Sequence, residues 1–173
     1  MRRPIVSSLA LASALVLMFA SSALGAPHHR SIQVLDNCDG PSFNAVLGEG
    51  ACSRAGGLSF DKLFASLASG GAPSWRFSPA RASIQAGGWL TAYNRGGEFH
   101  TFTPVAAFGG GCVPEINDAM GLSAVPECAN AGVLFGTTGV VPGGSLDTAP
   151  LSAGVHRFMC LIHPWQRSTV TAG

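Results

Sequence analysis

The run Met159-Cys160-Leu161-Ile162-His163-Pro164-Trp165-Gln166 decides how this chain of 173 residues is interpreted. Cys160 and His163 lie three residues apart, and Gln166 follows three residues later. A thiolate, an imidazole and a further polar donor at this spacing can close a tight loop around one metal ion. The run therefore predicts a metal site, which needs another strong ligand from elsewhere in the chain.

His100, in the run Asn94-Arg95-Gly96-Gly97-Glu98-Phe99-His100-Thr101, is the best candidate for that ligand. Alternation along a strand places His100 and Phe102 on one face, so the imidazole can point inward. Two imidazoles and one thiolate in a trigonal plane, with a weak axial donor, form the ligand set of copper in electron-transfer sites. The alternative is a surface histidine at the polar end of a strand.

The first 26 residues have the features of a secretory signal. Arg2 and Arg3 precede an apolar stretch over 9–20, which is short for a membrane span, and small residues follow it. Cleavage is expected after Gly25, with Ala26 as the alternative. No other stretch of about 18 apolar residues occurs. We therefore predict an exported protein, periplasmic or secreted, without a membrane span.

The composition favours a β protein that does not bind nucleic acid. Removing Arg2 and Arg3 with the signal changes the balance from 10 basic and 9 acidic residues to 8 and 9, a net charge of −1. The chain has a single lysine and no basic stripe, which argues against a nucleic-acid surface. Its 23 glycines and few charges are typical of a turn-rich β protein.

Five cysteines in an exported chain divide into two pairs and one remainder. Proximity favours the pairs Cys38–Cys52 and Cys112–Cys128, although four cysteines allow three connectivities. Each bridge would contribute about 3 kcal/mol by closing a short loop. Cys160 is then unpaired, and a free thiol in an oxidising compartment is a liability unless a metal occupies it.

Short patterns separated by glycine-containing turns predict an all-β fold. Apolar residues at helical spacing predict one short helix over 59–68, and a helical turn is expected near 115–120 within the long loop over 109–131. Many short strands with turns between them indicate a β-sandwich. The predicted strands cover residues 75–77, 81–85, 89–94, 99–105, 133–135, 155–160 and 168–171.

The two ligand segments resemble those of the cupredoxin (type 1 blue copper) family, with a ligand loop of the amicyanin and plastocyanin kind. His100 follows Asn94 by six residues across a glycine-rich turn, as in that family. Phe158 lies two residues before Cys160, where the family usually places an aromatic residue. The resemblance covers residues 75–173. It departs from the family pattern in one place, where glutamine replaces the axial methionine.

The resemblance implies a Greek-key β-sandwich of about seven or eight strands, to which the predicted short N-terminal helix and two disulfides would be added. It also implies one copper per chain. Gln166 would supply a weak axial oxygen, the alternative being that its side chain points to water. The implied metal ligands are His100, Cys160, His163 and Gln166.

The resemblance further implies electron transfer with a transient redox protein partner, in which the protein acts as a monomer. The exposed edge of His163 would be the electron port, and Pro164 and Trp165 would form the docking patch. No enzymatic activity is expected, because such a site has no open position for a substrate. Two other functions stay open: a copper carrier or storage protein of the cell envelope without a redox partner, and a metal-free cupredoxin-like interaction domain.

We expect residues 27–173 to form one cupredoxin-like domain. Within it, a disulfide-bearing segment with the short helix, residues 27–70, would pack on a copper-binding sandwich, residues 71–173. His28 and His29 would lie near the mature N-terminus. They are expected to form a solvated tail, or to chelate Cu(II) if cleavage follows Ala26.

Overall fold

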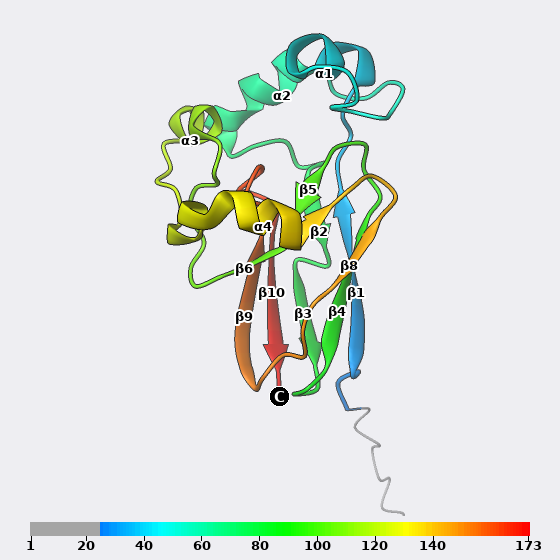
Figure 1. The fold of residues 1–173 in the computed structure, drawn as a ribbon, viewed down its shortest axis with the longest axis vertical. Coiled ribbons are helices and arrows are strands. Elements are labelled where there is room, and N and C mark those ends of the chain that lie inside the picture. Colours follow the sequence, from blue (N-terminus) through cyan, green and yellow to red (C-terminus); the bar gives the residue numbers. More distant parts are fainter. Residues whose placement is uncertain (1–24) are drawn as a thin grey trace, which may run out of the picture.

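The computed structural model describes residues 25–173, so the predicted signal peptide over 1–26 lies almost entirely outside the described residues (Figure 1). The strands are β1 (His29–Leu35), β2 (Arg76–Ser78), β3 (Arg81–Ile84), β4 (Trp89–Asn94), β5 (His100–Thr101), β6 (Thr103–Val105), β7 (Gly139–Val140), β8 (Ser145–Asp147), β9 (Gly154–Met159) and β10 (Arg167–Ala172). The helices are α1 (Gly40–Leu47), α2 (Phe60–Ser66), α3 (Pro114–Met120) and α4 (Ala131–Thr138), with 3-10 turns at Leu67–Ser69 and Pro126–Asn130.

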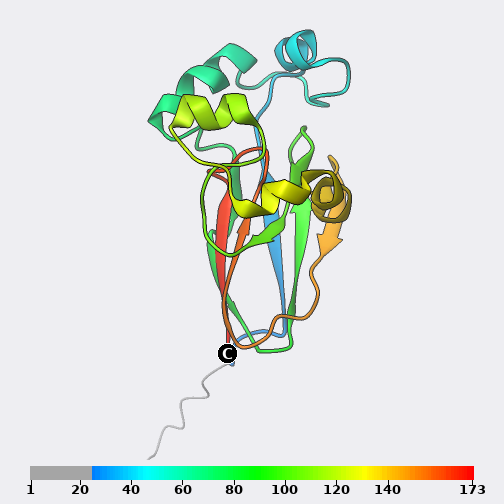
Figure 2. The same ribbon diagram turned by 60° about the vertical axis from the view of Figure 1, so that its left-hand side comes forward.

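The strands form a β-sandwich of two four-stranded mixed sheets. One sheet has the order β2-β1-β4-β8 and the other β3-β10-β9-β6, while β5 and β7 pair separately. Figure 2 shows β9 and β10 (orange and red) in one layer and β1 and β4 (blue and green) in the other. Between the layers, the ring of Phe102, which directly precedes β6, packs against the ring of Phe77 on β2 with ring centroids 5.1 Å apart. The predicted sandwich is therefore the observed architecture.

The predicted boundary at residue 70, between an N-terminal segment and the sandwich, is wrong because strand β1 belongs to the sandwich. It pairs in parallel with β4 over His29–Val34 and antiparallel with β2, so it lies inside the first sheet. Ile32 and Val34 are fully buried at period-2 spacing, as a strand with one face on the core requires. The sandwich therefore begins well before residue 71. The sequence does not predict this strand, because its alternation consists of only two fully buried apolar side chains among polar residues.

Two helices differ from the sequence-based expectations. The predicted strand at 133–135 is wrong, because these residues lie within helix α4. A run of three apolar residues fits a strand or a helix equally well, so periodicity alone could not decide. Helix α1 was not predicted. Asp39 caps it, since its carboxylate accepts a hydrogen bond from the backbone N–H of Ser42 at 3.2 Å.

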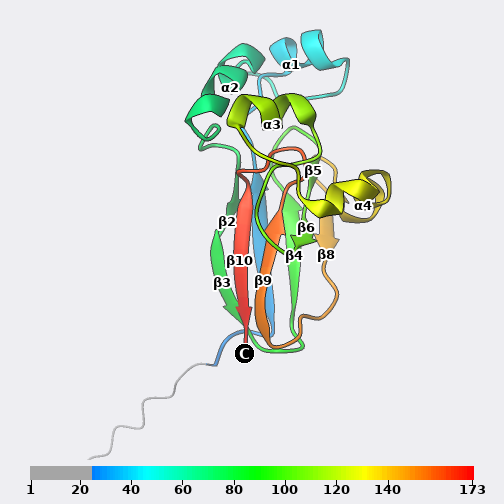
Figure 3. The same cartoon turned by 90° about the vertical axis from the view of Figure 1, so that its left-hand side faces the viewer.

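Helices α1, α2 and α3 gather at one end of the sandwich, and the C-terminus lies at the other (Figure 1). Seen from the side, the loop between β9 and β10 lies beneath α3 (Figure 3). This loop contains the predicted ligands Cys160 and His163. The helical end therefore covers the predicted site. None of the described helices is long and apolar enough to cross a membrane.

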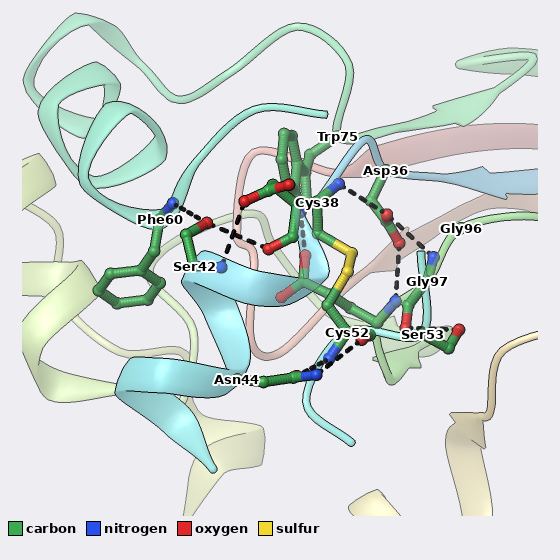
Figure 4. Close-up of a disulfide and its surroundings, with 12 residues drawn as sticks. Asp36, Cys38, Ser42, Asn44, Cys52, Ser53, Phe60, Trp75, Gly96 and Gly97 are labelled. Atoms are coloured by element: carbon green, nitrogen blue, oxygen red, sulfur yellow. Dashed lines mark hydrogen bonds between the residues drawn. A yellow bond between two sulfur atoms is a disulfide. The ribbon is translucent and has the colours of Figure 1, made fainter. Parts of the chain in front are cut away.

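Two disulfides fix the helical end, and they join the pairs that proximity predicted. Cys38–Cys52 encloses α1, and Figure 4 shows it beside Asp36 and the turn at Gly96 and Gly97. Cys112–Cys128 encloses α3. The backbone N–H of Cys112 donates to the carbonyl of Leu161 at 2.6 Å, which ties the second disulfide to the β9–β10 loop.

Because β1 belongs to the sandwich, truncating a core residue on it should destabilise the whole fold. Ile32→Ala removes a fully buried side chain and should lower the free energy of unfolding by about 2–5 kcal/mol. The exposed neighbour provides the control, since Ser31→Ala should change stability by less than about 0.5 kcal/mol. Urea unfolding of both variants measures the difference. Equal unfolding midpoints would place β1 outside the cooperative core.

Candidate metal centre

Three predicted ligand side chains meet in the interior with their donor atoms facing one another. The Sγ atom of Cys160 lies 3.8 Å from Nδ1 of His100 and 3.8 Å from Nδ1 of His163. The two imidazole nitrogens are 3.2 Å apart. All three residues are buried, and His163 is the most exposed at 3 %. Two nitrogens and a sulfur thus form a nearly isosceles triangle without contact with bulk water.

The triangle has the size that one transition-metal ion requires. From these distances, the sulfur lies about 3.4 Å from the midpoint between the two nitrogens. A point in the same plane that is about 2.0 Å from each nitrogen then lies about 2.2 Å from the sulfur. These are ordinary bond lengths for imidazole and thiolate on a first-row metal. The donor set therefore fits a trigonal metal without movement of the chain.

The short loop between β9 and β10 sets the geometry at the sulfur. The backbone N–H of Cys160 donates to the carbonyl of Gln166 at 3.1 Å, and that of Gln166 donates to the carbonyl of His163 at 2.9 Å. The loop is thereby closed on itself. The sulfur also accepts weak hydrogen bonds from the backbone N–H groups of Thr101 and His163, at 3.4 and 3.5 Å. These donors favour a thiolate.

Asp36 orients His100 from the opposite side. Its Oδ2 lies 2.8 Å from Nε2 of His100, so a neutral imidazole that donates from Nε2 presents the lone pair of Nδ1 to the centre. The carboxylate itself accepts hydrogen bonds from the backbone N–H groups of Cys38, Gly97 and Glu98. Figure 4 shows this carboxylate beside Cys38 and the turn at Gly96 and Gly97.

Glu98 plays a corresponding part beside His163. Its Oε1 lies 3.7 Å from Nε2 of His163, and its Oε2 accepts a hydrogen bond from the indole N–H of Trp75. Each imidazole of the triangle thus has a carboxyl group near its outer nitrogen. Neither acid was identified from the sequence. For Glu98, the sequence offers only its position two residues before His100 as an indication that it lies near the site. For Asp36, the sequence offers no such indication.

Gln166 is fully buried, so the alternative that it points to water does not hold. Its Nε2 donates to the carbonyl of Leu35 at 2.8 Å. Its Oε1 is buried without a hydrogen-bond partner among the described residues. A buried carbonyl oxygen without a partner costs free energy unless another group satisfies it. This oxygen therefore keeps its capacity to accept a hydrogen bond or to bind a cation.

The contacts within the cluster favour the thiolate form of Cys160 and the protonated form of His100 in the absence of a metal. Burial would raise the pKa of Cys160, but its contacts with His100 and His163 hold that pKa well below its usual value. Burial likewise opposes protonation of His100, whereas Asp36 and then Cys160 raise its pKa. Burial would also raise the pKa of Asp36, but hydrogen bonds from His100 and the backbone lower it to about 2. A metal that binds Nδ1 of His100 therefore competes with a proton.

The predicted exposed edge of His163 is not present. His163 is 3 % exposed and Pro164 is also buried, while Trp165 is partly buried. The indole of Trp165 packs edge-on against the His163 ring, with centroids 5.4 Å apart, and Glu98 lies beside Nε2. The sequence did not predict that the helical end of the molecule covers the loop. This cover is the reason why His163 is buried instead of exposed. His163 instead borders a cavity beneath the helices.

The other histidines do not join the site. His29 lies in β1, where its Nε2 is 2.8 Å from Oγ1 of Thr91, so it is not part of a solvated tail. His28 packs against Trp89, and His156 contacts the carbonyl of Ser152. A second group of potential donors, Asp36, Cys38 and Glu98, is excluded as a metal site because the sulfur of Cys38 is bonded to Cys52.

Comparisons with known proteins give distant structural likenesses. No family model and no curated protein matches the chain. A purple cupredoxin from Nitrosopumilus maritimus has a TM-score of 0.42 at 20% identity, covering 59% of this chain and 86% of that one. A Cu(I) amicyanin mutant gives 0.37 at 17% identity, covering 59% and 76%. A mutant fern plastocyanin gives 0.38 at 15% identity, covering 60% and 91%. These likenesses do not assign the chain to a family.

Removing the charge of Asp36 should weaken metal binding without removing a ligand. Asp36→Asn keeps the side-chain size but replaces one of the two carboxylate oxygens by an NH₂ group that cannot accept from the backbone. We expect metal affinity to fall about 10–100-fold, measured by competition with a chelator. Asp147→Asn, on β8 and away from the centre, should leave affinity unchanged. An unchanged affinity in Asp36→Asn would show that the carboxylate does not position His100.

Proposed function

We propose that the protein binds one copper ion per chain through His100, Cys160 and His163, and that it transfers electrons. One observation carries the proposal: the closed triangle of Nδ1, Nδ1 and Sγ atoms, which has the dimensions of a trigonal metal site. Two histidines and one cysteine with a weak axial donor are the ligand set of copper electron-transfer sites. The buried, unpartnered Oε1 of Gln166 supports a fourth, axial contact.

When bound, copper supplies one-electron exchange between Cu(I) and Cu(II). The chain contributes a rigid surrounding. His100 is held by Asp36, and the Cys160 loop is held by its own backbone hydrogen bonds. Burial excludes water from the three donors. A set of ligands that does not rearrange lowers the cost of changing the oxidation state, although whether such sites are strained is debated.

His163 is the ligand through which we propose that electrons pass. It borders the cavity beneath the helices, and Trp165 packs against its ring. A transient redox protein partner would then approach the helical end, with Pro164 and Trp165 behind the helices instead of on an open patch. The same proposal has four further parts. The protein acts as a monomer, is exported to the periplasm or beyond, and catalyses no reaction. Residues 27–173 have a Greek-key cupredoxin fold.

The two other functions have less support. A copper carrier needs ligands that an incoming protein can reach, whereas Cys160 and His100 are fully buried. A metal-free interaction domain would have no use for an unpaired cysteine that faces two imidazole nitrogens. The geometry thus favours a metal that stays bound.

The oxidised protein should contain one copper per chain and show an intense visible absorption from the Cys160 thiolate to Cu(II). Cys160→Ser removes that donor and should abolish the band. Ser31→Ala, at an exposed position of β1, removes no ligand and should keep it. Metal analysis and an absorption spectrum of the three proteins make the test. Zinc as the only bound metal, or a band that survives in Cys160→Ser, would sink the proposal.

Gln166 should set the reduction potential instead of deciding whether copper binds. Gln166→Met replaces an oxygen by a softer thioether, which favours Cu(I) and should raise the potential while copper stoichiometry and the thiolate band persist. Gln85→Met, at an exposed position, is the control and should not change the potential. Voltammetry at one pH and ionic strength compares the three proteins. If Gln166→Met has the wild-type potential, the axial role is wrong.

A further inference from the structure

A chain of hydroxyl groups joins the ligand loop to helix α4. Its first member is Thr101, whose Oγ1 accepts a hydrogen bond from the backbone N–H of Leu161 at 2.8 Å. The hydroxyl oxygen of Thr103 lies 3.0 Å from that of Thr101 and 2.7 Å from that of Thr138. The hydroxyl of Thr138 donates to a carbonyl of its own helix at 2.7 Å. The chain therefore begins one residue after the ligand cysteine and ends inside α4.

The local backbone brings these three threonines together. Thr101 and Thr103 are two residues apart in an extended segment, so their side chains share one face. Helix α4 leads directly into β7, which pairs with β5 so that Gly139 lies opposite Thr101. The backbone N–H of Phe102 donates to the carbonyl of Thr138 at 2.8 Å. This pairing holds the last residue of the helix beside the shared face of the two threonines.

Burial makes each hydroxyl of the chain depend on its neighbours. Thr101 and Thr103 are fully buried, and Thr138 is half-buried. A hydroxyl can donate one hydrogen bond and accept others, so the three groups can link the loop to the helix without a gap. A buried hydroxyl that loses a partner costs free energy, because water cannot take the partner's place. Removing one member should therefore loosen the others.

The chain reaches the candidate metal centre through Thr101. The backbone N–H of Thr101 donates to Sγ of Cys160 at 3.4 Å, while its hydroxyl holds the N–H of Leu161. One residue thus contacts both the sulfur and the peptide group that follows it. A hydrogen bond to a thiolate withdraws charge from the sulfur and weakens its donation to Cu(II), which raises the reduction potential of a copper site. A displacement of Thr101 would therefore alter that potential.

We propose that Thr138 is a positioning residue of the metal centre. It acts from helix α4 through the hydroxyls of Thr103 and Thr101, which hold the Leu161 peptide and the Cys160 sulfur in place. Helix α4 is thereby coupled to the thiolate. The coupling between the helix and the loop belongs to the metal-free chain, whereas its effect on a reduction potential rests on the proposed copper function.

Two neighbouring threonines of α4 provide a matched pair of variants. The hydroxyl of Thr137 donates to the carbonyl of Val133 at 3.0 Å, and this residue is exposed. Thr137→Val and Thr138→Val both remove a hydroxyl that bonds within the helix, and both keep the branched shape of the side chain. Only Thr138→Val interrupts the chain. Thr138→Ser retains a hydroxyl at the same position and should behave as the wild type.

Hydrogen exchange of the Leu161 amide in the metal-free full chain measures the coupling to the loop. Thr101→Val removes the acceptor of this N–H and should speed its exchange about tenfold, which corresponds to about 1.4 kcal/mol. Thr138→Val should speed it about threefold, and Thr137→Val should leave it unchanged. The Ile32 amide in β1 reports general stability and should exchange as in the wild type. Wild-type exchange of Leu161 in Thr138→Val, the same acceleration in Thr137→Val, or an equal acceleration at Ile32 would each overturn the proposal.

Voltammetry of the copper-loaded proteins tests the effect on the thiolate. Thr138→Val should lower the reduction potential, because a looser Thr101 donates a weaker hydrogen bond to the sulfur, whereas Thr137→Val and Thr138→Ser should keep the wild-type value. The double variant Thr101→Val/Thr138→Val should match Thr101→Val alone, since the chain is already broken.

A wild-type potential in Thr138→Val, or a further shift in the double variant, would contradict the proposed route through the hydroxyls. Failure of the copper function is distinguishable, because it would show as a missing thiolate band in the metal-loaded wild type. Amide exchange in the metal-free variants would then still decide whether Thr138 positions the ligand loop.

Discussion

The hydrogen bond between His100 and Asp36 is the contact on which the metal centre depends. It joins the end of β1 to β5, two segments that the chain separates by more than sixty residues. Asp36 can reach the imidazole because the turn before β5 has no side chains in the way. A Cβ atom on Gly96 would lie 1.8 Å from Oδ2 of Asp36. The carboxylate in turn fixes the turn through the N–H of Gly97, so ligand and scaffold support each other.

The helical end of the molecule gives this centre a different access from that of an open site. Three helices and two disulfides cover the loop that contains Cys160 and His163. The edge of the His163 imidazole therefore lies beside Trp165 and Glu98 instead of in solvent.

The sequence predicted the parts of the site that follow from local spacing. Cys160, His163 and Gln166 lie within one loop, and the distance of His100 from Asn94 pointed to a ligand through the resemblance to the cupredoxin family. Asp36 and Glu98 could not be assigned roles in this way, because those roles arise from packing between distant segments. The same limit applied to β1, whose main neighbour β4 is parallel and remote in sequence. Helix α4 was mistaken for a strand because its apolar run has no period.

The parallel pairings also have a consequence for the order of assembly. Strand β1 pairs with β4, and β3 pairs with β10, so each sheet closes only across a long intervening segment. Contacts of this kind form late, because the entropy of closing the loop is lost before the contact is gained. The donor triangle joins residue 100 to residues 160 and 163 and needs residue 36 behind it. A nascent chain that lacks β10 would therefore hold its thiol without an enclosed site, and the centre is completed in the last steps of folding.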